Sequence, residues 1–282
     1  MKNVTDQTTT AKGIVGRYGE IPLYGEEGFE GMRRAGRLSA LALDMLVDAV
    51  KPGVTTLELD KLASEFARDH GAIPANVGYH GFQHTLCTSI NHVVCHGIPA
   101  ERELRDGDII NIDITLIIDG WHGDTSRMYA VGAIARKAER LIDVTYESLA
   151  RGIAAARPGN TTGDIGAAIQ SYAEGERMSV VRDFVGHGVG RVYHDAPQIF
   201  HFGKPGEGVE LKPGMIFTIE PMINLGKPGV KVLADGWTAV TRDRSLSAQC
   251  EHSIGITETG CEIFTLSPGG LFNPTLKSVA AS

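Results

Sequence analysis

The feature that most constrains the fold of this 282-residue chain is an internal repeat. Four short motifs of the first half recur in the same order in the second half, two of them at offsets of 106 and 107 residues. The pairs are Lys51–Thr56 with Arg157–Thr162, His96–Pro99 with His194–Pro197, Leu104–Asp113 with Leu211–Glu220, and Asp119–Trp121 with Asp235–Trp237. One match can arise by chance, but four in one order indicate two related halves. The repeat therefore predicts one domain with a pseudo-twofold axis.

The first half opens with a helix-forming pattern. It begins near Glu26 and ends at Lys51-Pro52-Gly53, because proline lacks an amide donor and glycine frees the backbone. Thr55 followed by Glu58 predicts a capping box that opens a second helix to about His70. Apolar residues at helical spacing in the first segment are Phe29, Met32, Leu38, Leu41, Met45 and Ala49. Each half is thus expected to contribute two helices followed by strands.

These patterns predict an α+β protein with two pseudo-symmetric helix-helix-strand-strand halves. The halves are expected at about 26–132 and 133–266, within a single domain of residues 26–282 that ends in a short tail. Residues 1–25 are expected to form a polar extension. The repeat puts Asp113 and Glu220 at equivalent strand positions, and likewise His96 and His194. We expect these four side chains to meet near the axis.

A predicted hairpin brings two carboxylates together. Ile109–Ile118 is rich in isoleucine and reads as a strand, Asp119-Gly120 is a strong two-residue turn, and the return strand is expected over Trp121–Val131. In that register residue 113 faces 126 and residue 115 faces 124, so Asp113 and Asp124 are diagonal neighbours on one face. Two buried carboxylates repel each other unless a basic side chain or a metal ion lies between them.

The second half supplies further candidate ligands. His187 lies among glycines, Glu220 ends the apolar run Met215–Ile219, and Glu251 precedes the strand-like segment Ser253–Ile256. Aspartates, glutamates and one imidazole without a thiolate suit two adjacent divalent first-row ions rather than a structural zinc.

Composition excludes several classes of function. The net charge is −7, from 34 acidic and 27 basic residues, which argues against a dedicated nucleic-acid or anionic-membrane binder. No apolar run reaches the ~18 residues of a membrane span, and the N-terminus lacks the apolar core of a signal peptide. The four cysteines form no C-x-x-C pair. We therefore expect a cytoplasmic protein without a direct nucleic-acid site or a membrane partner.

The motifs taken together resemble the type I methionine aminopeptidases over about residues 26–266. The segments that carry the resemblance are His96-Gly97-Ile98-Pro99, Asn111-Ile112-Asp113, His122-Gly123-Asp124-Thr125, Gly186-His187-Gly188-Val189-Gly190, Phe217-Thr218-Ile219-Glu220-Pro221-Met222 and Gln249-Cys250-Glu251-His252. The resemblance implies the pita-bread fold, in which helices back a curved antiparallel sheet. It also implies removal of the N-terminal methionine from nascent proteins and peptides, with a preference for a small second residue.

The resemblance also implies a dinuclear centre. Asp113 would chelate one ion and His187 and Glu220 the other, while Asp124 and Glu251 would bridge both. The ions would be cobalt, manganese, iron, nickel or zinc, since such ligands accept all of these. The nucleophile would be a water or hydroxide shared by the two ions, and Glu220 would carry its proton towards the leaving amine.

Substrate contacts follow from the same resemblance. The family position of His194 hydrogen-bonds the scissile carbonyl oxygen, and that of His96 contacts the backbone nitrogen. The methionine pocket would be formed by Tyr79, Phe82, Cys87, Tyr193 and Trp237. At the rim of this pocket, Asn76 stands where some relatives have cysteine. The expected partners are N-termini of nascent polypeptides near the ribosome, and a monomer is expected.

Three alternatives remain to be weighed. Proline-directed relatives, aminopeptidase P and prolidase, carry a long N-terminal domain, whereas about 25 residues precede the first helix here. A type II methionine aminopeptidase would insert a helical subdomain, but only 25 residues separate His194 from Glu220 and 30 separate Glu220 from Glu251. A non-catalytic binding module of the same fold would have lost metal ligands. Each candidate residue also has an ordinary explanation as a turn, core or ion-pair residue. The internal repeat favours a functional site, because it independently pairs Asp113 with Glu220 and His96 with His194.

Overall fold

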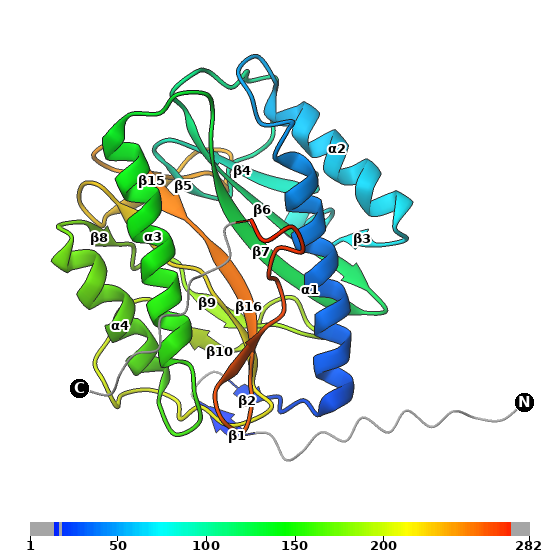
Figure 1. Ribbon diagram of the computed structural model, residues 1–282, viewed down its shortest axis with the longest axis vertical. Coiled ribbons are helices and arrows are strands. Elements are labelled where there is room, and N and C mark those ends of the chain that lie inside the picture. The colour runs from blue at the N-terminus through cyan, green and yellow to red at the C-terminus, as the bar shows by residue number, and fades with distance from the viewer. Residues whose placement is uncertain (1–13, 17–18, 272–282) are drawn as a thin grey trace, which may run out of the picture.

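The computed structural model describes residues 14–16 and 19–271 (Figure 1). The helices are α1 (Glu26–Leu46), α2 (Thr56–Asp69), α3 (Arg136–Ala155) and α4 (Thr162–Gly175), with a 3-10 turn at Tyr79–Gly81. The strands before α3 are β1 (Ile14–Gly16), β2 (Gly19–Ile21), β3 (Ile73–Pro74), β4 (Leu86–Ile90), β5 (Val93–Cys95), β6 (Ile109–Ile118) and β7 (Trp121–Ala130). Those after α4 are β8 (Ser179–Val180), β9 (Gly186–Gly188), β10 (Asp195–Ile199), β11 (Ile216–Ile219), β12 (Met222–Asn224), β13 (Val230–Val232), β14 (Ala239–Thr241), β15 (Ser247–Gln249), β16 (Glu251–Ile256) and β17 (Cys261–Ile263).

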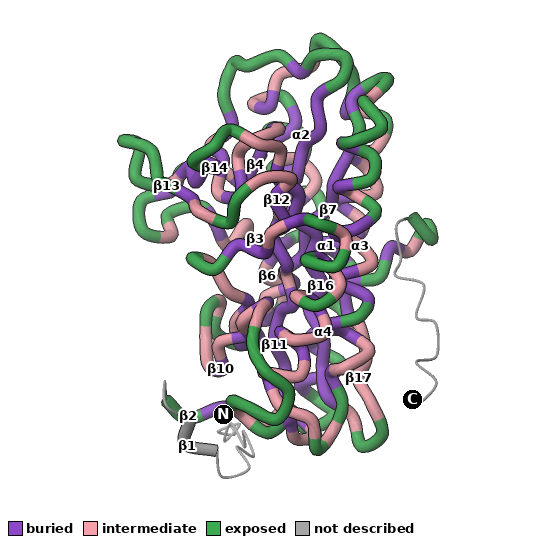
Figure 2. Tube along the Cα trace, turned by 90° about the vertical axis from the view of Figure 1, so that its left-hand side faces the viewer, coloured by how far each residue is buried: buried purple, intermediate pink, exposed green. Residues whose placement is uncertain are grey.

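The central element is a nine-stranded antiparallel sheet built from both halves. Its order is β10-β9-β11-β16-β7-β6-β3, with β4 also paired to β6 and β17 to β16. The halves meet where β16 pairs with β7. The helices lie on one side of this sheet, and its middle strands are buried (Figures 1 and 2). The predicted α+β class and pita-bread architecture are confirmed.

The pseudo-symmetry is visible in local detail. Thr55 caps α2 in a capping box with Glu58, and Thr161 caps α4 in the same way with Asp164. Both capping threonines also form an isolated antiparallel bridge, Thr55 with Glu103 and Thr161 with Glu210. The second helix of each half is therefore tied to the chain that leads into the sheet by the same contacts.

The first helix differs from its prediction in two ways. It ends at Leu46, ahead of Lys51-Pro52-Gly53, and the chain continues in hydrogen-bonded turns such as Val50 N–H to Leu46 O. Of the predicted apolar face, Leu41, Met45 and Ala49 are only partly buried, whereas Ala42, Leu43 and Leu46 are fully buried. The true face is shifted because small residues also face the sheet, allowing close approach of the helix.

Helix α1 lies very close to the β6–β7 hairpin. A Cβ on Gly123 would lie 2.2 Å from Ala35 O and 2.6 Å from Gly36 N. Ser39 Oγ donates a hydrogen bond to Gly123 O at 2.6 Å. Since side chains alternate along a strand, Gly123 facing the helix turns Asp124 towards the opposite face. The helix thereby fixes which face of β7 carries the carboxylate.

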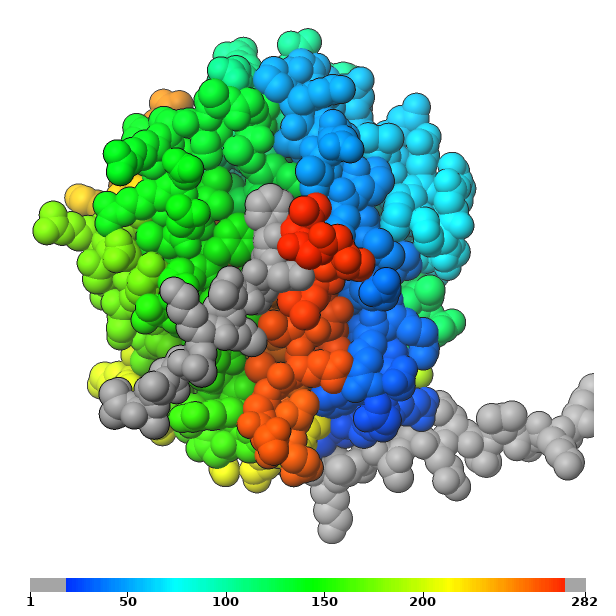
Figure 3. Space-filling model, viewed as in Figure 1, coloured from blue at the N-terminus to red at the C-terminus, as the bar shows by residue number. Residues whose placement is uncertain are grey.

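The helical face is closed by a late segment of the chain. In the space-filling view, the segment around β17 lies between α1 and α3 (Figure 3). Phe264 packs edge-on against Phe29 of α1, with ring centroids 5.3 Å apart, and Cys261 Sγ contacts Ile153 O of α3. This segment therefore joins the first helices of the two halves.

Part of the expected polar extension packs on the domain. Ile21 is 1% exposed within the core, and the Tyr24 ring meets Trp121 edge-on at 5.4 Å. Residues 1–13 and 17–18 of that segment lie outside the described residues, as do residues 272–282 of the expected tail. None of the helices in the described part combines the length and apolar character needed to cross a bilayer.

Candidate metal centre and substrate pocket

The β6–β7 hairpin places two carboxylates on one face of the sheet. Asp113 pairs with Ser126 and Thr115 pairs with Asp124, which confirms the register expected from the Asp119-Gly120 turn. Asp124 is 3% exposed, and its Oδ1 accepts a hydrogen bond from Thr115 Oγ1 at 2.6 Å. Asp113 Oδ1 is buried without a hydrogen-bond partner among the described residues. Such an orphaned buried oxygen needs a further partner.

His187 faces these carboxylates from β9. Its Nε2 lies 3.5 Å from Asp124 Oδ2 and 3.6 Å from Glu220 Oε1. Its Nδ1 lies 3.0 Å from Gly188 O, and because a carbonyl only accepts, Nδ1 carries the proton. Burial lowers the pKa of His187 to about 4, so the ring is neutral near pH 7. The unprotonated Nε2 therefore directs its lone pair towards two acids, and a cation bound between them could accept that lone pair.

Glu220 and Glu251 complete the acidic group from the second half. Glu220 follows β11, and its two oxygens accept hydrogen bonds from Thr218 Oγ1 at 2.8 Å and Gln249 Nε2 at 3.2 Å. Glu251 begins β16 and is 2% exposed. Ligand atoms of Asp124, His187 and Glu251 all lie within 4.8 Å of one another. Carboxylate and imidazole donors at this spacing fit a divalent ion.

Electrostatics support the same interpretation. Burial raises the pKa of Asp124 to about 6, opposed by the Thr115 hydrogen bond. Burial, with the Asp124 charge as the next cause, raises the pKa values of Asp113, Glu220 and Glu251 well above their usual range. Four acids in a dry site cannot all be ionised without positive charge among them. The residues present therefore fit divalent metal ions.

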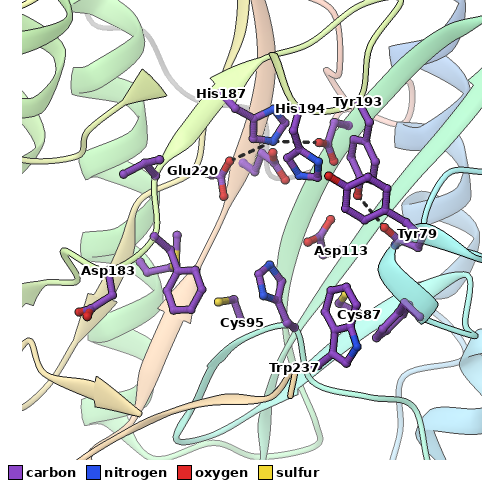
Figure 4. A pocket seen from close by; sticks show the side chains of 18 residues that line it. Tyr79, Cys87, Cys95, Asp113, Asp183, His187, Tyr193, His194, Glu220 and Trp237 are labelled. Carbon is purple, nitrogen blue, oxygen red and sulfur yellow. Dashed lines mark hydrogen bonds and ion pairs between the residues drawn. The ribbon is translucent and has the colours of Figure 1, made fainter. Parts of the chain in front are cut away.

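A cavity of about 320 Å³ opens beside the acidic group. All twelve residues that the sequence analysis assigned to metal or substrate line it: Tyr79, Phe82, Cys87, His96, Asp113, Asp124, His187, Tyr193, His194, Glu220, Trp237 and Glu251. Figure 4 shows His187 and Glu220 together, Trp237 beside Cys87 at the other end of the cavity, and Asp113 between these two groups. Asp113 and Cys87 are paired on the adjacent strands β6 and β4. The fold therefore places all twelve predicted site residues around one cavity.

The apolar part of the cavity is an aromatic cage. The Phe82 and Trp237 rings meet edge-on at 5.0 Å, and the Tyr79 and Tyr193 rings meet at 5.1 Å. Burial raises the pKa of Cys87 well above its usual range, so its thiol remains protonated and apolar. Aromatic rings and a thiol suit a thioether side chain, because sulfur makes favourable contacts with ring edges.

Two further histidines stand between the acids and this cage. The His194 ring centroid lies 4.3 Å from that of His187. The His96 ring lies 6.1 Å from the Trp237 ring. Burial and neighbouring histidines lower the pKa of His194 to about 3 and that of His96 to about 4. Both rings are therefore neutral hydrogen-bonding groups near pH 7.

Sequence reasoning gave no role to four residues that hold the candidate ligands. They are Thr115, Thr218, Gln249 and His201, whose Nε2 accepts a hydrogen bond from Glu220 N–H at 3.0 Å. Thr218 and Glu220 are two positions apart, so strand alternation could have placed them on one face. Nothing in the sequence pairs His201 with Glu220, since that contact depends on how β10 leads into the following loop.

Comparison with known proteins agrees with this geometry. The profile of metallopeptidase family M24 matches residues 30–258. A methionine aminopeptidase from Rickettsia prowazekii is 56% identical over 255 residues, which is 90% of this chain and 98% of the relative. The chain belongs to the methionine aminopeptidases of family M24.

Comparison with solved structures shows which proteins share this fold. The crystal structure of the Rickettsia prowazekii methionine aminopeptidase matches with a TM-score of 0.87 and 57% identity, covering 87% of this chain and 100% of that one. A prolidase from Pyrococcus furiosus matches with a TM-score of 0.69 at 20% identity, covering 86% and 65%. The second likeness shows a shared fold alone, whereas the first supports the methionine aminopeptidase family over the 87% of the chain that it covers.

Proposed function

We propose that this protein removes the N-terminal methionine from nascent proteins and peptides, using two divalent metal ions held at the junction of its halves. The observation that carries the proposal is the neutral His187, whose Nε2 faces Asp124 and Glu220 beside an aromatic cavity. We also propose that residues 26–282 form a single catalytic domain. A preference for a small second residue belongs to the same proposal and rests on the family resemblance.

Asp113 would hold one ion and His187 and Glu220 the other, with Asp124 and Glu251 shared between them. Bound divalent ions would lower the pKa of a water molecule to near neutrality and polarise the scissile carbonyl. Cobalt, manganese, iron, nickel and zinc all suit oxygen and imidazole ligands. The orphaned Asp113 Oδ1 and the raised carboxyl pKa values support a site that is completed by positive charge.

Protein side chains would position the substrate and move the proton. Glu220 takes the proton of the attacking water and delivers it to the leaving amine, held in place by Thr218 and Gln249. His194, neutral near pH 7, donates a hydrogen bond to the carbonyl oxygen where negative charge develops. His96 contacts the backbone nitrogen on the scissile side.

Methionine would occupy the aromatic end of the cavity. The expected contacts are Tyr79, Phe82, Cys87, Tyr193 and Trp237. The edge-on Phe82–Trp237 pair offers ring edges to sulfur, and the buried Cys87 thiol adds a second polarisable group. An unbranched side chain fits such a pocket better than a branched or charged one.

The cellular setting is part of the same proposal. The substrates would be N-termini of nascent chains near the ribosome, in the cytoplasm, with the enzyme acting as a monomer. The net charge of −7 gives no support to direct nucleic-acid binding by the chain as a whole.

Four peptides test the proposal side by side: Met-Ala-Ser, Met-Lys-Ser, Ala-Pro-Ser and formyl-Met-Ala-Ser, each with Co²⁺ present. Cleavage of Met-Ala-Ser alone is expected, because a free α-amine and a small second residue are both required. Faster turnover of Ala-Pro-Ser would instead indicate a proline-directed peptidase. No turnover of any peptide would favour a binding module.

A further inference from the structure

The rim of the cavity is connected to the acidic group by a chain of hydrogen bonds. Tyr193 Oη donates to Asn76 Oδ1 at 2.6 Å and lies 3.0 Å from Thr115 Oγ1. The single hydroxyl proton of Thr115 is shared between two acceptors, Asp124 Oδ1 at 2.6 Å and this Tyr193 oxygen. Asn76 is 7% exposed and Thr115 is fully buried. A polar chain in so dry a place holds its members firmly, because an unpaired group there is costly.

The orientation of each member is fixed. Asn76 Nδ2 donates to Thr85 O at 3.0 Å, so the amide oxygen must face Tyr193 and accept from it. The Tyr193 ring is also stacked on His122, at 5.7 Å and an interplanar angle of 12°. Asn76 therefore sets where the phenol oxygen lies, and that oxygen is one of the two neighbours of the Thr115 hydroxyl.

The far end of the chain determines how Asp124 presents its carboxylate. Thr115 engages Oδ1, which leaves Oδ2 directed at His187 Nε2, 3.5 Å away. A rotated carboxylate would offer a different oxygen in a different direction. The chain also crosses the molecule, since Tyr193 lies between β9 and β10 in the second half and the other members belong to the first.

We propose that Asn76 is a positioning residue for the metal centre, acting through Tyr193 and Thr115 on the orientation of the Asp124 carboxylate. The inference rests on the proposed function, because it assumes that Asp124 binds metal. Under this proposal Asn76, at the rim of the methionine pocket, influences how tightly the metal ions bind. Groups that orient a metal ligand typically change metal affinity by roughly 10- to 100-fold when removed.

The test is a double-mutant cycle read out by metal binding. Co²⁺ is titrated into chelator-treated wild type, Asn76→Ala, Tyr193→Phe and the double variant, and followed by its visible absorption. Each single change should weaken Co²⁺ binding roughly tenfold. The double variant should be no weaker than the single variants, because both act through one chain. Thr115→Val, which removes the last link, should weaken binding at least as much.

A matched control separates positioning from general loosening. Asn160→Ala removes one side-chain hydrogen bond to a backbone carbonyl, Ala155 O, outside the cavity. It should keep wild-type Co²⁺ affinity even if its melting temperature falls. In Asn76→Ala, raising Co²⁺ above the new Kd should restore most of kcat for Met-Ala-Ser, which a distorted fold would not allow.

The outcomes separate the two proposals. If wild type binds no Co²⁺, the proposed function fails and the inference fails with it. If wild type binds Co²⁺ but Asn76→Ala and Tyr193→Phe bind it equally well, only the inference is overturned. Independent, additive losses in the double variant would also overturn it, since they would mean that Asn76 and Tyr193 act separately.

Discussion

Asp124 on β7 and His187 on β9 come from opposite halves of the chain, yet Asp124 Oδ2 lies 3.5 Å from His187 Nε2. Asp124 is buried and His187 is half-buried, and the histidine is neutral near pH 7 because desolvation lowers its pKa to about 4. A neutral nitrogen lone pair beside an acid is not an ion pair. The contact is therefore best understood as two ligands facing a shared position.

Removing metal should abolish peptidase activity and lower the melting temperature. The ions would bind only the folded protein, so each ion present at 100 times its Kd adds about 2.7 kcal/mol to the free energy of unfolding. Activity on Met-Ala-Ser and thermal unfolding are measured after chelation and again after adding Co²⁺ or Mn²⁺. Full activity in protein shown by elemental analysis to be metal-free would contradict the mechanism.

Metal affinity should rise with pH above pH 5. Without metal, burial raises the pKa of Asp124 to about 6 and raises those of Asp113, Glu220 and Glu251 well above their usual range, so these groups hold protons that metal must displace. The His187 pKa of about 4 means that the imidazole releases none in this range. Calorimetric titration of Co²⁺ in buffers of different ionisation enthalpy should show proton release. A pH-independent Kd between pH 5 and 8 would refute this.

His187→Ala and His194→Ala should have opposite signatures. Loss of His187 should weaken metal binding, because its Nε2 is a candidate ligand. Loss of His194 should leave metal stoichiometry unchanged and lower kcat by roughly 10²- to 10³-fold, as for one lost oxyanion donor. His70→Ala, at the exposed end of α2, serves as the control and should match wild type. A metal ion lost from His194→Ala would instead make that residue a ligand.

Gly123→Ala should destabilise the fold by about 1–3 kcal/mol, as overpacking of a close contact does. Its Cβ would meet the backbone of α1 at Ala35 and Gly36, which cannot move aside as a side chain could. Gly175→Ala, at the end of α4 with open space around it, should be neutral or stabilising. Denaturant unfolding of both variants measures the difference. Equal stabilities would show that α1 does not set the position of β7.

Local chemistry explains what the sequence predicted well. The Asp119-Gly120 turn has two central residues at positive φ, and that geometry fixes the β6–β7 register and hence the neighbours of Asp124. The Thr55–Glu58 capping box fixed the start of α2 in the same way. The internal repeat predicted which side chains of the two halves meet, because it related Asp113 to Glu220 across more than a hundred residues.

Long-range contacts explain what the sequence could not predict. The helix face of α1 was misplaced because its packing depends on Gly123, which lies far along the chain. The short strands β8 to β10 carry too few residues to show a period of two. The hydrogen bond from Tyr193 to Asn76 joins two loops, and no spacing rule relates residues 117 apart.

The pseudo-twofold relation between the halves has an evolutionary consequence. In a dimer of identical halves, every side chain near the axis would occur twice and no position could vary alone. Here one polypeptide carries both copies, so Asp113 and Glu220 differ in length at matching places, and His194 is more exposed than the partly buried His96. Covalent fusion of the copies thus permits mutation on one side of the cavity to be selected without a mirrored change on the other.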